Sequence, residues 1–542
     1  MSDHADFLLM NGRIWKGLGL GFAEALACRQ GKVLATGTDA EIMALGGPDT
    51  RVIDLNGRLA TPGLNDAHLH LHMYGLAMAE VDLRPKSAPT LTALLDALRT
   101  KAADTPKGEW ITGRGYDHFK LETGRHPYRE ELDEACPDHP VYIVRTCGHL
   151  AVANSAALEL AGITDDTPSP EGGLIERQNG RLTGLLAETG RGAVTAVLPE
   201  LTVEMLIDAI ERGGRDLLSY GITSCMEAAI GIREGWPEME AYLAAKQQER
   251  LPLRVYGCIM GDKTRSILEK ATEAGMITGT GDEMFRHGPV KIFTDGSAGG
   301  RTAAMTWPYL GGDPEDKGLL CIPDQAELTG MVVAAHRAGY QMAIHAIGDA
   351  AIDQVLEAYE AALADMPVAD RRHRIEHCGW LRPDQMQRMI DMHIIPVPQP
   401  SFLYWFGDLY CTVAEQERVE ASHPMRTWIE AGLNPSASTD CPVTEVDPMP
   451  VIYNMVTRKT SNGTVLGPEH RLSMEEALHA YTGASAYASH EETIKGRLEP
   501  GQLGDIAVWE RDLFTIDPDQ ITATRCDMTI LGGRVVHERE GQ

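Results

Sequence analysis

The sequence predicts an α/β fold, a (β/α)8 TIM barrel with an insertion after strand 1 and a small β-sandwich built from both termini. Three observations predict it. Eight short apolar runs alternate mostly with amphipathic helical segments, one long stretch interrupts that alternation, and hairpin signals mark both chain ends. We expect residues 1–60 plus 488–542 to form the composite β-sandwich. Residues 61–487 then form the barrel, with 73–215 as the inserted substructure.

The predicted barrel strands are short apolar runs, as expected for buried parallel strands. They are Leu59–Leu64, Gly221–Ala228, Leu253–Met260, Gly288–Asp295, Tyr340–Ile347, His373–Gly379, His393–Pro398 and Leu433–Thr439. Helical periodicity separates most of them, as in Gln325–Ala338, Ala350–Ala364 and Pro383–Met392. Because a barrel of this kind carries its chemistry at the carboxyl ends of its strands, polar residues that close these runs are the candidates for a functional site.

Both chain ends have the pattern of a β-hairpin. Asn11-Gly12 near the start and Gly532-Gly533 near the end each separate two short apolar runs, and such dipeptides supply the positive φ of tight turns. An isolated hairpin is only marginally stable in water, so we expect the two ends to assemble into one module.

The stretch from about Leu71 to Tyr220 interrupts the alternation of strands and helices. It contains two predicted helices, Thr90–Ala103 and Val203–Leu218, and an extended piece, Val141–Arg145. Long insertions after a barrel strand commonly form lids or binding walls. We therefore expect 73–215 to be a lid or substrate-binding substructure.

The composition excludes several classes of protein. The 49 Lys and Arg residues against 78 Asp and Glu residues give a net charge of −29, which disfavours binding to nucleic acid or anionic lipid. No stretch has the roughly 18–20 uninterrupted apolar residues of a membrane span, and no secretory leader is expected. The 10 Cys residues are scattered without a C-x-x-C pair, which favours a reducing, cytoplasmic location.

We expect a small-molecule substrate and a homodimer or higher homo-oligomer.

The strongest local signal for chemistry is the pair His68 and His70 in the segment Thr61–His70. Two histidines two residues apart in extended chain project from the same side, so both imidazoles can reach one cation. Four later runs end in, or contain, further candidate ligands: Lys291, His345, His377 and Asp440. Side chains from separate barrel strands converge at the mouth, and this donor set suits zinc or a similar cation. The structural alternatives are a strand lysine neutralised by Asp295, satisfied core histidines, and a helix N-cap at Asp440.

The order H-x-H, Lys, His, His, Asp on successive strands resembles that of the amidohydrolase superfamily of metal-dependent hydrolases. Finer motifs resemble the branch that includes N-substituted formamide deformylase, amidohydrolase family 3. These motifs are Gly148–Leu158, Lys291–Ala303, Ile344–Asp349 and Ser438–Val443. The resemblance spans nearly the whole chain.

The resemblance implies a binuclear metal site with two divalent ions, zinc in the first place and Mn or Fe as alternatives. His68 and His70 would bind one ion with Asp440, while His345 and His377 would bind the other. Lys291 would bridge both ions, which requires that CO₂ carboxylates it, because an ammonium cannot ligate. A bridging hydroxide activated by the ions would attack a carbonyl. Asp440 would accept a proton as general base and return it to the departing amine as general acid.

The sequence offers weaker candidates for supporting roles. Three carboxylates near ligands could orient imidazole N–H groups, with simple turn or strand-end carboxylates as the alternative: Asp66, Asp349 and Glu376. His72 continues the alternation, and we expect it in the wall of the site or behind a ligand, in contact with that ligand or its partners, rather than as a third ligand. Candidates for substrate binding are His149, Asn154 and Tyr116 in the insertion, and Tyr404 and Trp405 in the run Phe402–Phe406, which we expect to be a barrel-mouth loop. A structural role is the alternative for each.

The leading hypothesis for function is an enzyme that hydrolyses a C–N bond other than a peptide bond, in an amide, N-acyl or N-formyl compound. Lactone or ester hydrolysis and deamination of a ring are alternatives on the same scaffold. Single-metal deaminases of the superfamily typically carry H-x-x-E, whereas His345 is followed by Ala346, Ile347 and Gly348, which disfavours deamination. A non-catalytic scaffold is a distant alternative, because such relatives have lost ligands and this chain keeps the whole set. The loop Gly296–Arg301 lacks P-loop spacing and is assigned to structure around Lys291.

Overall fold

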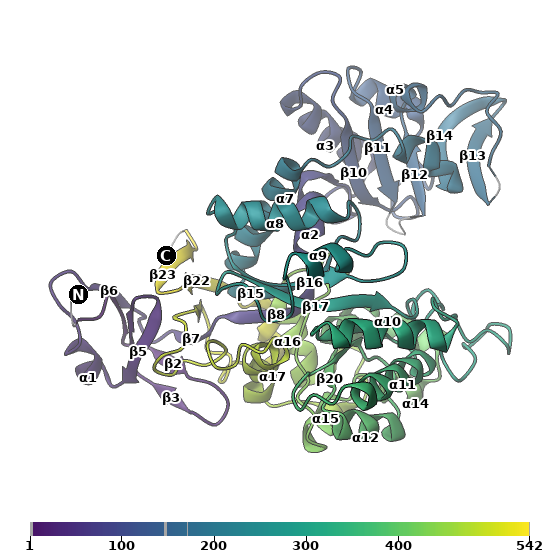
Figure 1. Ribbon diagram of the computed structural model, residues 1–542. Coiled ribbons are helices and arrows are strands. Elements are labelled where there is room, and N and C mark those ends of the chain that lie inside the picture. The colour runs from purple at the N-terminus through teal and green to yellow at the C-terminus, as the bar shows by residue number, and fades with distance from the viewer. Residues whose placement is uncertain (1–3, 146–148, 171, 541–542) are drawn as a thin grey trace. The chain divides into compact units, whose positions relative to one another are not determined.

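The computed structural model describes residues 4–145, 149–170 and 172–540 (Figure 1). Gly148 of the predicted motif Gly148–Leu158 and Cys147 lie outside the described residues. The chain forms two compact units. We call Met73–Ala209 the smaller unit, and Met1–His72 with Ile210–Gln542 the main unit.

A seven-stranded parallel sheet forms the centre of the main unit, in the order β20-β19-β18-β17-β16-β15-β8. Its strands are β8 (Leu64–Leu69), β15 (Ile222–Ile230), β16 (Arg254–Met260), β17 (Phe285–Phe293), β18 (Met342–Ala346), β19 (Arg374–His377) and β20 (Ile395–Val397). Nearly every residue of these strands is buried, as is usual for a parallel sheet that is covered on both faces. The sheet is a nearly closed barrel, so the predicted α/β barrel class is confirmed.

The predicted strand Leu433–Thr439 is wrong, because residues 434–440 have no regular strand pairing. This segment nevertheless runs beside β8. The Ala67 N–H donates to the Ala437 carbonyl at 3.2 Å, and the Asp440 N–H donates to the His68 carbonyl at 2.8 Å. Toward β20 the contacts come from side chains, such as the Ser438 hydroxyl on the Pro398 carbonyl at 2.9 Å. An irregular segment therefore takes the place of the eighth strand.

The predicted first strand, Leu59–Leu64, is also displaced. Residues Leu59–Pro62 form β7, which pairs with strands from both chain ends, and the barrel strand β8 starts only at Leu64. Gly63 separates the two strands. A Cβ atom at Gly63 would lie 2.2 Å from the Thr223 hydroxyl oxygen, so the close approach of the chain to β15 requires glycine there.

Helices cover the barrel sheet and follow its strands. They are α8 (Trp236–Gln247), α9 (Leu268–Glu273), α10 (Gln325–Arg337), α11 (Asp349–Asp365), α12 (Pro383–Asp391), α13 (Pro400–Val413), α14 (Gln416–Glu420), α15 (Met425–Glu430), α16 (Pro448–Thr457), α17 (Met474–Ala480) and α18 (Gly483–Ala488), with short 3-10 turns at Pro468–His470 and Pro518–Ala523. Helices α10, α11 and α12 match their predicted ranges and lie side by side (Figure 1). The run Phe402–Phe406 is not a loop but part of α13, which Pro400 opens in the first turn.

Two sheets lie beside the barrel, and the larger one combines strands from both chain ends. A four-stranded sheet has the order β5-β4-β1-β6, and a six-stranded sheet has the order β23-β22-β21-β7-β2-β3. Their elements are β1 (Phe7–Met10), β2 (Arg13–Trp15), β3 (Phe22–Ala23), β4 (Ala25–Arg29), β5 (Lys32–Gly37), α1 (Asp39–Met43), β6 (Arg51–Asp54), β7, β21 (Ile506–Trp509), β22 (Cys526–Leu531) and β23 (Arg534–Glu538). The purple N-terminal and yellow C-terminal strands lie together in Figure 1. One buried cluster contains Leu9, Leu26, Ile506 and Ile530, so both ends contribute to one core.

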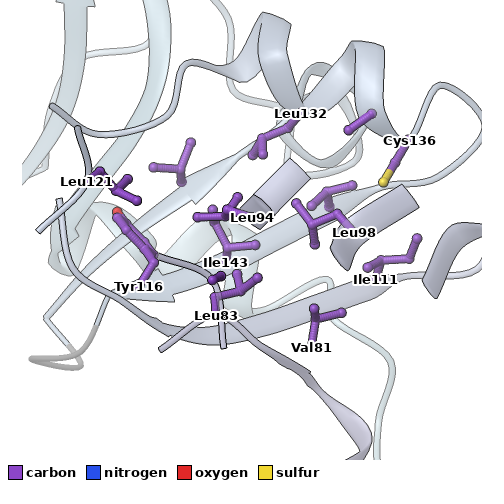
Figure 2. Close-up of a cluster of buried hydrophobic side chains, with 14 of the residues drawn as sticks. Val81, Leu83, Leu94, Leu98, Ile111, Tyr116, Leu121, Leu132, Cys136 and Ile143 are labelled. Carbon is purple, nitrogen blue, oxygen red and sulfur yellow. The ribbon is translucent and has the colours of Figure 1, made fainter. Parts of the chain in front are cut away.

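The smaller unit has its own sheet, in the order β13-β14-β12-β11-β10-β9. Its elements are β9 (Val81–Asp82), α3 (Leu91–Asp104), β10 (Ile111–Tyr116), α4 (Arg129–Ala135), β11 (Val141–Arg145), β12 (Leu150–Ala153), α5 (Ser155–Leu160), β13 (Gly173–Gln178), β14 (Arg181–Glu188), a 3-10 turn at Thr189–Arg191 and α6 (Gly192–Thr195). Helices α2 (Leu71–Ala79) and α7 (Val203–Ser219) span its two boundaries. Figure 2 shows its core, where Leu94 and Leu98 of α3 and Leu132 of α4 pack against Ile111 and Ile143. Within the described ranges, no helix has the length and apolarity to span a membrane.

Candidate metal centre

The six predicted ligands all belong to the main unit and are buried. His68 lies in β8 and His70 directly after it, Lys291 lies in β17, and His345 lies in β18. His377 ends β19, and Asp440 lies in the irregular segment beside β8. Because the strands are parallel, their carboxyl ends come to one edge of the sheet, and the six side chains start from that edge.

Three of these residues form a compact group of donor atoms. One ligand atom each of His68, His70 and Asp440 lies within 4.8 Å of the others. Asp440 Oδ1 is 3.5 Å from His68 Nε2 and 3.3 Å from His70 Nε2. Within the described ranges, Asp440 Oδ1 and His70 Nδ1 are buried and have no hydrogen-bond partner. Buried polar atoms are rarely left unpartnered, and a divalent cation among these donors would satisfy Asp440 Oδ1. The residues present therefore fit a bound metal ion.

Lys291 lies against this group. Its Nζ atom is 3.4 Å from His68 Nε2, and only 1% of the residue is exposed. Among the residues that the structure describes, no carboxylate forms an ion pair with it, and burial lowers the pKa of its amine. Asp295 does not neutralise it, since that carboxylate accepts backbone N–H groups from Ala304, Ile347 and Gly348 at 2.8–3.0 Å.

His345 and His377 complete the cluster. Their ring centroids are 4.3 Å apart, and the His377 ring is 5.0 Å from that of His68. Burial, followed by the neighbouring His345, holds the pKa of His377 well below the usual value for histidine. A neutral imidazole is the form that binds a metal.

Hydrogen bonds orient three of the four imidazoles. His68 Nδ1 donates to Glu376 Oε2, and His377 Nδ1 donates to the Gln399 side-chain oxygen, both at 2.5 Å. In each ring the Nε2 atom is left for a metal. His345 has the opposite orientation, because its Nε2 donates to the Gly296 carbonyl at 3.0 Å, which leaves Nδ1.

Glu376, a predicted supporting residue, therefore contacts His68, a predicted ligand, directly. It also accepts two hydrogen bonds from the Arg374 guanidinium, at 2.8 and 3.0 Å. Burial raises the pKa of Glu376, but Arg374 and His68 outweigh that effect and hold the pKa at about 2. The carboxylate is thus charged over the whole neutral range and remains an acceptor for His68 Nδ1.

The other two predicted supporting carboxylates, Asp66 and Asp349, accept hydrogen bonds from backbone N–H groups and hydroxyls and, over the described ranges, do not contact the ring of a predicted ligand. Asp66 accepts the His68 N–H at 3.1 Å and the Thr439 hydroxyl at 2.8 Å, so it ties β8 to the Asp440 segment. Burial raises the pKa of Asp66 to about 7 against the effect of these bonds. Asp349 accepts the Thr306 N–H at 2.8 Å and pairs with Arg382, rather than with any predicted ligand.

Glu227 and Gln399 are contacts that our sequence predictions did not include. Glu227 lies in β15 and faces His70 and His72, while Gln399 precedes α13 and faces His377. Glu227 could have been found in the sequence, because it is the only ionisable carboxylate in the apolar run Ile222–Ile230. His72 is not on the strand, because α2 starts at Leu71.

The predicted substrate contacts lie in different surroundings. Asn154 is 1% exposed and caps α5, accepting the Val141 and Ala157 N–H groups and donating to the His139 carbonyl. Tyr116 is part of the core in Figure 2, with its hydroxyl 2.9 Å from His126 Nδ1. His149 is exposed and lies 3.0 Å from Glu188. All three belong to the smaller unit.

Aromatic side chains of the main unit border the cluster. The Phe402 ring stacks on His377 with centroids 5.7 Å apart, and Phe293 lies 5.4 Å from His345. The faces of Phe402 and Phe293 lower the local dielectric around these two histidines. The predicted substrate contacts Tyr404 and Trp405 follow Phe402 on α13 and pack on each other, with ring centroids 4.8 Å apart, and the Tyr404 ring also lies 6.0 Å from that of Tyr453 of α16.

Comparison with known proteins agrees with this geometry. The chain is 28% identical over 532 residues to the N-substituted formamide deformylase of Arthrobacter pascens, with 96% of each protein covered. It is 32% identical to the protein LONG AFTER FAR-RED 3 of Arabidopsis thaliana, over 98% of this chain and 92% of that protein.

A solved structure and a family model match as well. An uncharacterised metal-dependent hydrolase from Pyrococcus horikoshii superposes with a TM-score of 0.77 at 29% identity, covering 95% of this chain and 99% of that chain. The family model described as "Amidohydrolase family" matches residues 51–537. With the converging ligand set and this match over most of its length, the chain belongs to the amidohydrolase family.

Proposed function

We propose that this amidohydrolase-family hydrolase cleaves a C–N bond other than a peptide bond, in an amide, N-acyl or N-formyl compound, and that it uses two divalent metal ions. One observation carries the proposal: His68, His70 and Asp440 form a buried group of donors in which Asp440 Oδ1 has no hydrogen-bond partner within the described ranges. A relative of the same length named N-substituted formamide deformylase supports the C–N bond as the target.

The six residues would divide between two ions. His68, His70 and Asp440 would hold one ion, and His345 and His377 the other. Lys291 lies 3.4 Å from His68 and would reach both as a carbamate. Burial favours its neutral amine, whose nitrogen adds to the carbon of CO₂ and loses one N–H proton. When bound, divalent ions lower the pKa of a coordinated water and polarise a carbonyl oxygen.

The residues of the chain itself would orient groups and move the proton. Glu376 and Gln399 hold the rings of His68 and His377 through their Nδ1 atoms, so these rings cannot rotate away. Asp440 Oδ1, which has no hydrogen-bond partner among the described residues, would hold the ion, and the second carboxylate oxygen, Oδ2, would accept the proton of the attacking water. It would then return that proton to the nitrogen of the leaving amine as the C–N bond breaks.

Metal analysis and turnover assays on the purified protein test this function. We expect close to two divalent ions per chain, with zinc as the first expectation. We also expect release of an amine from N-substituted formamides or N-acyl amines that stops when the metal is removed and resumes when it is returned. Active protein without bound metal would overturn the proposal. If the protein instead releases a hydroxy acid from lactones, its target is an ester bond. If it releases ammonia from aminated heterocycles, it is a deaminase. Either result would contradict the proposed cleavage of an amide-type C–N bond.

A pair of histidine variants provides the matched control. We expect His68→Ala to lose both metal and turnover. His139→Ala removes a buried histidine of the smaller unit whose ring contacts the Glu109 carbonyl instead of the cluster. We expect this variant to keep its metal.

A further inference from the structure

We propose that Glu227 positions His70 for metal binding, and that His72 and Tyr242 hold Glu227 for that purpose. The inference rests on the proposed metal centre. It assigns a role to a buried carboxylate and to the third histidine of the H-x-H-x-H sequence. Neither residue is a ligand in the proposed set.

His70 is the exception among the imidazoles of the cluster. His68, His345 and His377 each donate one ring N–H to a protein oxygen at 2.5–3.0 Å, so each ring presents its other nitrogen to the centre. His70 Nε2 lies 3.3 Å from Asp440 Oδ1, on the side of the proposed ion, so a His70 that binds the ion through Nε2 carries its N–H on Nδ1. Within the described part of the chain, Nδ1 has no hydrogen-bond partner, although it is buried.

The carboxylate that faces His70 Nδ1 is Glu227, with Oε1 at 3.8 Å. Its two oxygens differ in their contacts. Oε2 accepts three donors: the backbone N–H of His72 at 3.3 Å, His72 Nδ1 at 3.1 Å and the Tyr242 hydroxyl. Oε1 accepts one donor, the Ala229 N–H at 3.2 Å. Because Oε2 is saturated and Oε1 is not, the free acceptor capacity of Glu227 points to His70.

The surroundings hold Glu227 in this orientation. Glu227 and Tyr242 are both fully buried, and Tyr242 extends from α8. One turn earlier on α8, Glu238 accepts the backbone N–H groups of Gly231, Arg233 and Glu234 and lies 3.4 Å from His72 Nε2. Glu227 lies in β15, and these bonds to Glu238 tie helix α8 to the loop that directly follows that strand. His72 is in turn held between two carboxylates, which explains a third buried histidine that is not a ligand.

A fixed acceptor on the far nitrogen sets the tautomer and ring orientation of a metal-binding histidine and raises its affinity for the metal. Removing such an acceptor typically weakens metal binding by about 10- to 100-fold. Glu227→Gln keeps the size of the side chain but replaces one carboxylate oxygen by an amide N–H₂ group, which is a donor. The variant side chain therefore has only one acceptor oxygen and cannot face His70 and His72 with an acceptor on each side. We expect this variant to lose the His70 ion first.

The experiment measures metal per chain and metal affinity by chelator competition, together with thermal unfolding, for the full-length protein. Glu227→Gln should bind one of its two ions about 10- to 100-fold more weakly than the unaltered protein. Tyr242→Phe keeps the Glu227 carboxylate but removes the hydroxyl that donates to it. This variant should therefore bind the same ion more weakly than the unaltered protein, but less weakly than Glu227→Gln does. Glu227→Asp keeps the charge and should bind that ion more tightly than Glu227→Gln.

Asp505→Asn is the matched control. Asp505 is a buried carboxylate that pairs with Arg254 at the opposite end of β16, and its loss should lower thermal stability without changing metal affinity. The inference is overturned if Glu227→Gln and Tyr242→Phe bind both ions as tightly as the unaltered protein. It is also overturned if Asp505→Asn loses metal to the same degree, because the effect would then be one of general stability. An unaltered protein that binds no divalent metal would instead refute the proposed function.

Discussion

Asp440 has a left-handed backbone, with φ at 56°, at the point where its carboxylate meets two imidazoles. His377 is also left-handed, with φ at 69°. Such conformations cost non-glycine residues about 1–3 kcal/mol each and persist only where neighbouring contacts impose them. The Asp440 N–H bond to the His68 carbonyl is one such contact. The strain thus lies at the proposed metal ligands themselves.

The proton-transfer role of Asp440 predicts a specific effect of Asp440→Asn. Asparagine tolerates the left-handed backbone and has the same shape, so we expect the fold and most of the metal to be retained. Turnover should fall by roughly 10²- to 10⁴-fold, because the amide cannot accept the proton. Steady-state kinetics and metal analysis on the same sample measure both quantities. A variant with near-normal kcat would exclude Asp440 as the proton shuttle.

The proposed carbamate on Lys291 makes a prediction of its own. Lys291→Ala should lose metal and turnover, and a short carboxylic acid such as acetate or propionate should restore part of both by occupying the vacated space. In the unaltered protein, isotope-labelled CO₂ should give a carbamate signal by carbon NMR. Lys291→Arg keeps a cation but cannot form the carbamate, so it serves as the control and should not regain activity. Full activity of Lys291→Ala without added acid would contradict the bridging role.

At the scale of elements, the barrel depends on the pairing of β8 with an irregular segment. Asp66 joins the two, because it accepts bonds from His68 on β8 and from Thr439 on the segment. Tyr481, just before α18, donates a further bond to Asp66 at 3.0 Å. These side-chain bonds add to the few backbone bonds between β8 and the segment, such as Asp440 N–H to the His68 carbonyl, where a regular eighth strand would form a full ladder.

The corner between α14 and α15 predicts a pH dependence of stability. His423 lies there with φ at 49°, and neither ring nitrogen has a hydrogen-bond partner among the described residues. Burial, followed by the charge of Arg458, lowers the pKa of His423 to about 3. In the unfolded chain the pKa is about 6.5, so below that pH the unfolded state takes up a proton that the folded state refuses. His423 therefore destabilises the fold progressively as the pH falls from about 6.5 toward 3.

The comparison of the unaltered protein with His423→Asn isolates this effect, since asparagine also tolerates the left-handed backbone. Between pH 6.5 and 5 we expect the stability of the unaltered protein to fall more steeply, by up to about 1.4 kcal/mol per pH unit. Urea unfolding of both proteins, stripped of metal, measures the difference. Parallel pH profiles would show that His423 does not carry the predicted proton linkage.

At the scale of the whole molecule, the chain has two compact units with separate cores, and the main unit joins both chain ends to the barrel. Arg254 at the start of β16 forms a buried ion pair with Asp505 just before β21, with Nε to Oδ2 at 2.7 Å. Asp505 also accepts the Gly532 N–H at 2.8 Å. The terminal strands are thus fastened to the end of the barrel strand that is farthest from the ligands.

The separate cores predict that damage to the smaller unit leaves the metal centre intact. Ile143 is fully buried in the cluster of Figure 2, and Ile143→Ala should destabilise that unit by about 2–5 kcal/mol. We expect faster proteolysis within Met73–Ala209 and unchanged metal per chain. Limited proteolysis followed by mass spectrometry, with metal analysis alongside, measures both. Loss of metal in this variant would contradict the assignment of all ligands to the main unit.

Some features of the site followed from local pattern, and others did not. His68 and His70 share one side because of strand geometry, and the strand-end positions of His345 and His377 follow from the apolar runs before them. Glu227 was not predicted, since its relation to His70 depends on the pairing of β15 with β8 and on Tyr242 from α8. The irregular path near Asp440 depends on side-chain bonds to Pro398 and Asp66, which no periodicity encodes.

The sequence by itself determined the barrel class, the candidate metal ligands and the family resemblance, because residue type, spacing and alternation are local properties. Only the tertiary structure decided that β8 starts at Leu64, that no regular eighth strand forms, and which acceptor faces each imidazole. These features depend on distances between residues far apart in the chain. Such distances are set by how the sheet closes and packs.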